Sequence, residues 1–213
     1  MDNSMKLYDF AMAPNSRRVR VFAAEKGIAL ELVAVDLSTR EQMGADFRAI
    51  NPRMAVPALA LDDGTLITES VAICRYLEET HPQPALFGSD ALSKAQVEMW
   101  HRRVELEGLQ AVAEGVRNSV DFFAGRAIAG PVDFPQIPQL AERGKLRVDW
   151  FYTMLNERLA DNEYIAGAHF SIADIAALIA CDFAKVLKKR VGDDTPNLKR
   201  WYDAVSARPS SRA

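Results

Sequence analysis

A chain of 213 residues, 49% of them apolar, is long enough to bury a sizeable core in two small domains or one large one. Its formal net charge of -3 gives no electrostatic argument for binding nucleic acid or an anionic membrane. No apolar run approaches the roughly 20 residues of a membrane span, and the N-terminus lacks the apolar region of a signal peptide. We therefore expect a cytoplasmic protein with no nucleic-acid or membrane partner.

The first third of the chain has the pattern of a βαβ unit. Residues 6–10 alternate in polarity like a short strand, and apolar side chains recur at helical spacing over residues 19–23. The apolar run of residues 29–35 predicts a second strand. Two strands joined by such a helix are parallel, with a right-handed crossover. Residues 41–50 are weakly helical and lead into the next strand.

A hairpin and a helix follow this unit. Pro57 opens a short apolar strand, and Asp63-Gly64 separates it from a second strand at residues 66–68, which is a strong hairpin signal. Ser70 stands where the strand pattern gives way to a helical one. A helix start has free N–H groups and a positive partial charge, so this junction is suited to binding an anion.

The second part of the chain predicts only helices. Residues 81–90 have no periodicity, so we interpret them as a linker between a first domain at residues 1–80 and a second domain at residues 91–213. An apolar helical stripe extends from about residue 92 to 123, and a second long helix is expected at residues 146–159. These two helices are expected to pack antiparallel.

Local signals predict which groups are buried in this second domain. Ser171 and Asp174 have the form of a capping box ahead of a helix that is apolar nearly all round, which predicts a central buried helix. Cys74 and Cys181 lie far apart in apolar helical patterns and are expected to be buried thiols. We expect His101 at the surface, and we expect no metal site.

The runs Val56-Pro57-Ala58-Leu59 and Thr68-Glu69-Ser70, followed by Ile73 to Leu77, resemble the glutathione-binding half of the cytosolic glutathione S-transferase family. The segments Leu7-Tyr8-Asp9 and Met99 to Leu106 are similar to the bacterial and fungal Gtt2-like group. The resemblance implies a thioredoxin-like first domain of βαβ-ββα order and an all-helical second domain. It also implies a homodimer.

The resemblance assigns roles in binding glutathione as a co-substrate. It implies a cis Val56-Pro57 bond, with the Val56 backbone pairing with the cysteinyl part of glutathione. Glu69 and Ser70 would bind the γ-glutamyl end, because a carboxylate suits an ammonium group and a hydroxyl at a helix start suits a carboxylate. Arg40 and Gln42 would hold the glycyl carboxylate.

The chain departs from the family at the residue that activates the thiol. Alignment of the residues around Arg18 and Arg20 puts Ala13, which cannot donate a hydrogen bond, at the usual catalytic serine or cysteine. Asn15 and Ser16 remain as candidate catalytic donors to the thiolate. Ser16 is equally well interpreted as the N-cap of the first helix, with no catalytic part.

The cationic side chains Arg17, Arg18 and Arg20 cluster at the start of this helix, where positive charge is disfavoured. We expect ion pairs between the domains or across a dimer. The alternative is that they attract a glutathione carboxylate.

The resulting hypothesis is an enzyme of detoxification, a glutathione S-transferase that joins the glutathione thiolate to small soft electrophiles, whose identity no motif specifies. The apolar side chains Val116, Val120, Phe122 and Phe123 would offer the electrophile a surface. A glutathione-dependent isomerase of maleylacetoacetate type or a peroxidase is one alternative, although Arg17 replaces the aromatic residue of the isomerase pattern. A non-catalytic binding or regulatory protein of the same fold is the other, and Ala13 favours it.

Overall fold

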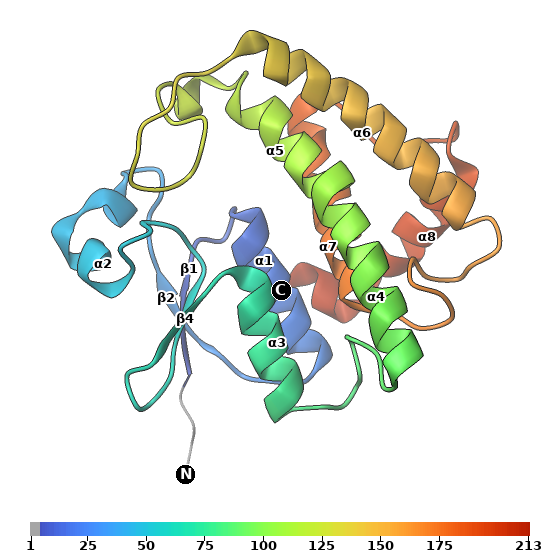
Figure 1. The fold of residues 1–213 in the computed structure, drawn as a ribbon, viewed down its shortest axis with the longest axis horizontal. Coiled ribbons are helices and arrows are strands. Elements are labelled where there is room, and N and C mark those ends of the chain that lie inside the picture. The colour runs from blue at the N-terminus through green and yellow to red at the C-terminus, as the bar shows by residue number, and fades with distance from the viewer. Residues whose placement is uncertain (1–4) are drawn as a thin grey trace. The chain divides into compact units, whose positions relative to one another are not determined.

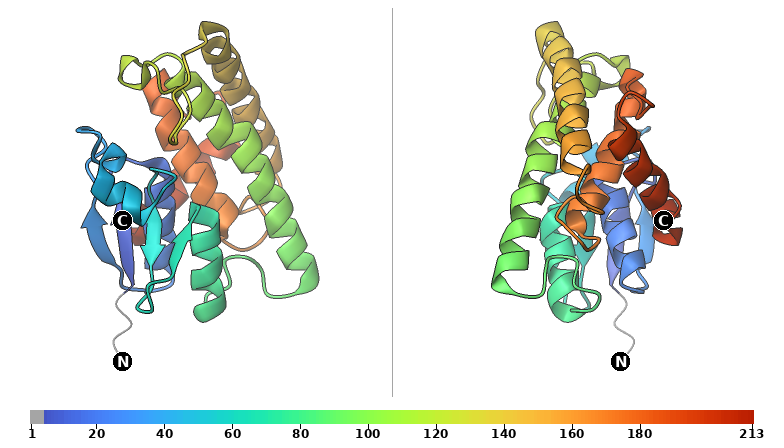
Figure 2. Two further views of the ribbon diagram at one scale, coloured as in Figure 1. Left: turned by 60° about the vertical axis from the view of Figure 1, so that its left-hand side comes forward. Right: turned by 90° about the vertical axis from the view of Figure 1, so that its right-hand side faces the viewer.

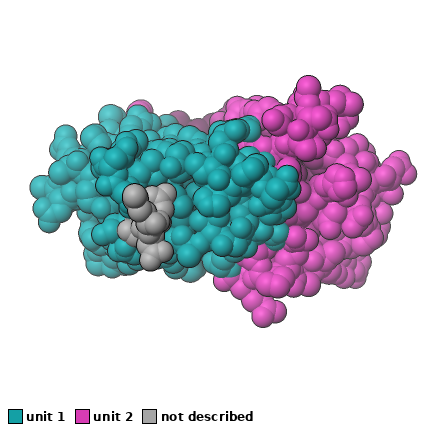
Figure 3. Space-filling model, turned by 90° about the horizontal axis from the view of Figure 1, so that it is seen from below, with its two compact units in different colours: residues 1–84, 128–133, 213 teal, residues 85–127, 134–212 magenta. Residues whose placement is uncertain are grey.

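The computed structural model describes residues 5–213 and divides into two compact units. Unit 1 comprises the chain up to residue 84 together with residues 128–133 and 213. Unit 2 comprises residues 85–127 and 134–212. Figure 1 shows the elements along the chain, and Figure 3 colours the two units separately.

Unit 1 has the thioredoxin-like fold that the sequence predicts. Within residues 5–84, four strands form a sheet of order β2-β1-β3-β4. Strand β1 is parallel to β2 and antiparallel to β3, and β3 is antiparallel to β4. The elements of this unit are β1 (Lys6–Asp9), α1 (Pro14–Glu25), β2 (Glu31–Ala34), η1 (Glu41–Met43), α2 (Ala45–Ile50), β3 (Ala58–Ala60), β4 (Leu66–Thr68) and α3 (Ser70–Thr80).

Two helices cover one face of this sheet. Helices α1 and α3 pack against each other there, and α2 lies on the opposite face (Figure 1). The side chains that α1 and α3 turn inward are fully buried, among them Val19 and Phe22 of α1 and Ile73 and Leu77 of α3. Figure 2 shows the two helices from two further directions. Unit 1 therefore contains the N-terminal turns of two helices that pack together.

The hairpin between β3 and β4 turns where the sequence predicts. Gly64 has a φ of 85°, which glycine adopts without steric cost. The backbone N–H of Thr65 donates to Asp63 Oδ1 at 2.8 Å and closes the turn. The prediction of a hairpin at Asp63-Gly64 is confirmed.

Unit 2 is all-helical, as predicted, within the residues that the structure describes. Its elements are α4 (Ala91–Arg103), η2 (Val104–Leu109), α5 (Gln110–Arg117), η3 (Asp121–Phe123), α6 (Pro138–Arg158), α7 (Ile172–Ala184), η4 (Lys185–Leu187), α8 (Pro196–Ser206) and η5 (Pro209–Arg212). Among the described residues, no helix has the length and apolar character needed to cross a membrane.

Two helix predictions for unit 2 are wrong in extent. The expected continuous helix from residue 92 to 123 is interrupted by the π-helix η2 and ends as an α-helix at Arg117. The helix expected at residues 146–159 begins at Pro138, because proline is well suited to the first position of a helix, where no N–H is needed. Other prolines precede residue 138 and indicate a loop, so the sequence does not reveal where the helix starts.

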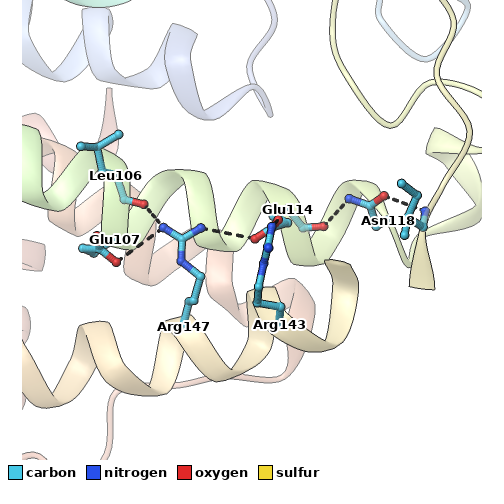
Figure 4. A network of polar contacts seen from close by, with 7 residues as sticks. Leu106, Glu107, Glu114, Asn118, Arg143 and Arg147 are labelled. Carbon is cyan, nitrogen blue, oxygen red and sulfur yellow. Dashed lines mark hydrogen bonds and ion pairs between the residues drawn. The ribbon is translucent and has the colours of Figure 1, made fainter. Parts of the chain in front are cut away.

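Ion pairs join α5 to α6 (Figure 4). Glu114 of α5 pairs with both Arg143 and Arg147 of α6, the latter at 3.3 Å. Arg147 also lies 3.5 Å from Glu107 and donates to the carbonyl oxygen of Leu106. A carboxylate shared by two guanidinium groups one helical turn apart holds the two helices in register.

The capping box at the start of α7 is confirmed. The Asp174 carboxylate is fully buried and accepts hydrogen bonds from Ser171 N at 3.0 Å, Ile165 N at 2.9 Å and Trp201 Nε1 at 2.9 Å. Burial raises the pKa of Asp174 to about 6, against the opposing effect of these hydrogen bonds. This carboxylate therefore ties the start of α7 to α8 and to the loop before it.

Two predictions about single side chains have opposite outcomes. Cys74 and Cys181 are both buried free thiols, as expected. The prediction of a surface His101 is wrong, because its ring is fully buried and meets the Phe87 ring edge-on, with centroids 6.5 Å apart. The polarity of its neighbours along α4 does not reveal this contact.

Candidate functional site

The register of the sheet brings three segments of unit 1 to one end of it. Tyr8 of β1 stands opposite Ala58 of β3, which in turn stands opposite Thr68 of β4. In antiparallel pairs, the residues after Tyr8, before Ala58 and after Thr68 therefore leave the sheet at the same end. These are the start of α1, the Val56-Pro57 turn and the Glu69-Ser70 junction.

The Val56-Pro57 turn presents free backbone groups. The Val56-Pro57 peptide bond is cis, as the resemblance implies. Among residues 5–213, neither the N–H nor the C=O of Val56 makes a hydrogen bond. The position can pair with an extended peptide, because both groups are unused.

The buried side chain of Asn51 shapes this turn and was missed by sequence reasoning. Its Nδ2 donates to the carbonyl oxygen of Ala55 at 2.7 Å, and its Oδ1 accepts from the backbone N–H of Arg53 at 3.0 Å. Asn51 therefore holds the loop that precedes Val56. The dipeptide Asn51-Pro52 is the only sequence signal for this role, and it indicates a turn without naming its partners.

The junction before α3 is strained at Glu69. This residue has a φ of 66°, a conformation that costs a side chain of this size on the order of 1–3 kcal/mol. Glu69 is exposed and its side chain makes no capping hydrogen bond to α3. The first N–H groups of α3 consequently have no side-chain cap from this residue, and the helix dipole favours an anion there.

Ser70, the first residue of α3, is 6% exposed. Its Oγ accepts a hydrogen bond from Arg18 Nη1 of α1 at 3.1 Å. The same Oγ lies 3.5 Å from Asn15 Oδ1. The two helix starts are thus connected by side chains that come from positions 52 and 55 residues away from Ser70.

The start of α1 offers N–H groups rather than a side-chain cap. Ala13 is the N-cap and donates its own N–H to the carbonyl oxygen of Phe10 at 2.9 Å. The N–H groups of Asn15 and Ser16 have no hydrogen-bond partner among the described residues. The interpretation of Ser16 as the N-cap is wrong, because helix α1 begins two residues earlier, at Pro14.

The two candidate thiolate donors differ in accessibility. The side chain of Asn15 is exposed, whereas Ser16 is fully buried and its Oγ has no partner in the part of the chain that the structure describes. Of these two side chains, only that of Asn15 is accessible to a ligand.

Comparisons with known proteins identify the family of the chain. Residues 7–85 match the N-terminal domain model of glutathione S-transferases, and residues 132–209 match the C-terminal domain model. The chain is 35% identical to glutathione S-transferase 2 of Saccharomyces cerevisiae over 217 residues, which cover 99% of this chain and 89% of the yeast protein.

This chain belongs to the glutathione S-transferase family. Its structure resembles the crystal structure of a Gtt2-class transferase of Vibrio parahaemolyticus, with a TM-score of 0.82 and 40% identity over 96% of this chain and 94% of that one. It also resembles Gtt2 of Saccharomyces cerevisiae, with a TM-score of 0.87 and 31% identity over 96% of this chain and 97% of the yeast chain. The chain is therefore a Gtt2-like member of the family.

Two members of the cationic cluster, Arg18 and Arg20, have partners inside unit 1. Arg20 pairs with the buried carboxylate of Asp9 and donates to the carbonyl oxygen of Ala11 at 2.9 Å. Arg18, as described, contacts Ser70. The expectation that Arg20 pairs across domains or across a dimer is wrong, because the first strand of its own unit supplies the carboxylate.

Arg40 and Gln42 lie in the segment after β2. The parallel pairing of Asp9 with Ala34 means that β1 and β2 end at the same edge of the sheet, so this segment leaves from the end that carries the site. Arg40 is exposed, with a φ of 64°. The Oε1 atom of Gln42 is buried and has no hydrogen-bond partner among residues 5–213.

The residues expected to contact the electrophile belong to the end of α5 and the turn after it, in unit 2. Val116 is 2% exposed and is part of the helical core, while Val120 and Phe123 are partly buried against that core. The guanidinium of Arg117 lies 4.5 Å from the centre of the Phe123 ring. Within the described residues, no cluster of three or more His, Cys, Asp or Glu side chains could hold a metal ion.

Proposed function

We propose that this transferase joins the thiolate of glutathione to small, soft electrophiles. The observation that carries the proposal is the convergence, at one end of the sheet, of the unpaired Val56 backbone and the start of α3 at Ser70. The Val56 backbone can pair with an extended peptide, and the start of α3 can bind a carboxylate. Glutathione has both features.

The proposed binding mode follows from these groups. The N–H and C=O of Val56 pair with the cysteinyl backbone of glutathione, beside Pro57. At the γ-glutamyl end, the carboxylate of Glu69 receives the ammonium group, while Ser70 and the first N–H groups of α3 bind the α-carboxylate. Arg40 and Gln42 hold the glycyl carboxylate.

Activation of the thiol requires stabilisation of its anion. A thiol pKa near 8.5 leaves only a few per cent thiolate at neutral pH. Lowering that pKa by about two units requires about 2.7 kcal/mol in favour of the thiolate. Asn15 and the free N–H groups of Asn15 and Ser16 are donors at a helix start, where hydrogen bonds to an anion are strengthened by charge.

In the proposed reaction, the thiol loses its proton to solvent and the sulfur forms a bond to an electrophilic carbon. A leaving group departs with the electron pair in a substitution, or a neighbouring carbon takes up a proton in an addition. Val120 and Phe123, with Val116 behind them, are proposed to contact the electrophile. We also propose a cytoplasmic homodimer as the working form.

Calorimetry of reduced glutathione with the intact protein and with Ser70→Ala tests the proposal. We expect micromolar to millimolar binding that Ser70→Ala weakens strongly, together with conjugation of a chlorodinitrobenzene. Binding without conjugation, but with turnover of maleylacetoacetate or an organic hydroperoxide, would favour the alternative enzymes. No heat and no thermal shift with several millimolar glutathione would overturn the proposal and favour a non-catalytic protein.

A further inference from the structure

Arg18 of α1 is a buried charged residue that contacts Ser70 of α3. The residue is only 3% exposed, and its Nη1 lies 3.1 Å from Ser70 Oγ. A guanidinium is always charged in proteins and costs free energy to bury. Beside Ser70 at the start of α3, this charge can act on an anion that binds there.

The geometry determines which way the Ser70 hydroxyl can donate. A serine hydroxyl has one proton and two acceptor lone pairs, whereas arginine has donors only. The bond from Arg18 therefore occupies a lone pair of Oγ and leaves the Ser70 proton to be donated elsewhere. Among the described residues, the hydroxyl donates to Asn15 Oδ1 at 3.5 Å, which is at the limit of a hydrogen bond.

A ligand carboxylate can replace that weak acceptor. Its oxygen would receive the Ser70 proton at normal distance and, unlike the amide of Asn15, would carry a charge opposite to that of Arg18. The charges are close to protein rather than to bulk water, so salt screens them less than it would at the surface. Arg18 and the start of α3 then act on the same anion.

On this basis, and resting on the proposed function, we propose that Arg18 is a positioning residue for the γ-glutamyl carboxylate of glutathione. It holds Ser70 Oγ as an acceptor, so that the Ser70 proton is directed at the carboxylate, and it supplies positive charge behind that hydroxyl. It thereby makes the site specific for a ligand with an α-carboxylate.

The test compares two ligands by calorimetry. One is glutathione, and the other is the analogue in which a 4-aminobutyryl group replaces the γ-glutamyl group and removes only the α-carboxylate. We expect Arg18→Gln to weaken glutathione binding about tenfold or more and to change the affinity for the analogue less than about twofold. In a Ser70→Ala background, the loss caused by Arg18→Gln should be smaller.

The matched control is Arg75→Gln, which removes the same charge from α3. Arg75 lies 4.0 Å from Glu79, and its side chain is 44% exposed. This change should leave the affinity for both ligands unaltered. If Arg18→Gln does not fold, Arg18→Lys retains the charge without the planar fork, and we expect a smaller loss that is again confined to glutathione.

Two results would overturn the inference. One is unchanged glutathione affinity in a folded Arg18→Gln variant, or in Arg18→Lys where only that variant folds. The other is an equal loss for glutathione and the analogue, which would indicate a general distortion of the site. Either result leaves the proposed function standing as long as the intact protein binds glutathione. If the intact protein does not bind glutathione, both this inference and the proposed function are overturned.

Discussion

Lys26 Nζ lies 2.7 Å from Glu78 Oε2, and this ion pair joins the end of α1 to the end of α3. The Lys26 side chain is 0% exposed, and Nζ also donates to the carbonyl oxygens of His81 at 2.6 Å and Pro84 at 2.7 Å. One ammonium group therefore neutralises a buried carboxylate and satisfies two backbone acceptors. It fastens the ends of the two helices whose other ends carry the proposed glutathione site.

We expect Lys26→Met to lower the free energy of unfolding by about 3 kcal/mol, because it removes one partner of a buried ion pair. Urea denaturation at neutral pH measures this change. The control is Lys6→Met, since Lys6 pairs with Glu31 at 3.5 Å with both side chains about half exposed. Such a surface pair contributes about 0–1 kcal/mol. Equal losses in the two variants would contradict the role of Lys26.

The buried Asp174 predicts a pH dependence of stability. Its pKa in the folded protein is raised from the ordinary 3.8 to about 6, so the folded state binds a proton more tightly than the unfolded state. The stabilising effect of this proton is complete below pH 3.8 and is lost as the pH rises through 6. At 1.36 kcal/mol per unit, the whole effect is about 3 kcal/mol.

Asp174→Asn isolates that dependence, because asparagine does not titrate. On lowering the pH from 7 to 4.5, we expect the intact protein to gain stability relative to the variant, measured by denaturant unfolding at each pH. The variant should also be less stable at all these pH values, because an amide cannot accept all the hydrogen bonds that the carboxylate accepts. A stability difference that does not change with pH would contradict the prediction.

Substitutions can distinguish the two candidate donors to the thiolate, because the Asn15 side chain is exposed and the Ser16 side chain is buried. We expect Asn15→Ala to raise the pKa of bound glutathione by about 1 unit, as loss of a hydrogen bond to a charged group implies. Ser16→Ala should leave that pKa unchanged, because the Ser16 side chain is fully buried. The ultraviolet absorbance of the thiolate, titrated against pH in each variant, gives the comparison. A larger shift in Ser16→Ala than in Asn15→Ala would assign the role to Ser16.

Gly144 permits the close approach of α6 to α5. A Cβ at this position would lie 2.5 Å from the backbone nitrogen of Gly115 and 2.8 Å from the carbonyl oxygen of Ala111. Because backbone atoms cannot move aside as a flexible side chain can, we expect Gly144→Ala to destabilise the protein by about 2–3 kcal/mol.

The measurement is thermal unfolding of Gly144→Ala, with Gly192→Ala as the control. A Cβ at Gly192 would meet the carboxylate of Asp194 at 3.0 Å, which can rotate away. Gly192→Ala should therefore cost much less. If Gly144→Ala melts at as high a temperature as Gly192→Ala, the prediction is wrong, because α5 and α6 can then move apart without loss of stability.

Short-range signals were sufficient for much of the fold. The turn at Asp63-Gly64 depends on a backbone conformation that glycine supplies, and the capping box at Ser171 and Asp174 depends on groups three residues apart. Both are visible in the sequence because the interacting groups are neighbours along the chain. The start of α6 at Pro138 was missed, since proline ends a loop and begins a helix equally well.

Local patterns in the chain predicted the order of strands and helices in unit 1 and the helical nature of unit 2, and the resemblance of short motifs predicted the family. Val56, Pro57, Glu69 and Ser70 were assigned to the proposed site through the resemblance to the family, while the local pattern at Ser70 indicated a helix start suited to an anion. Three features became visible only in the folded chain: Arg18 contacts Ser70, Ser16 and His101 are buried, and Asn51 supports the Val56 turn. Burial of a polar side chain and the partner of a distant one depend on how helices and loops pack, and those contacts leave no periodic signal in the chain.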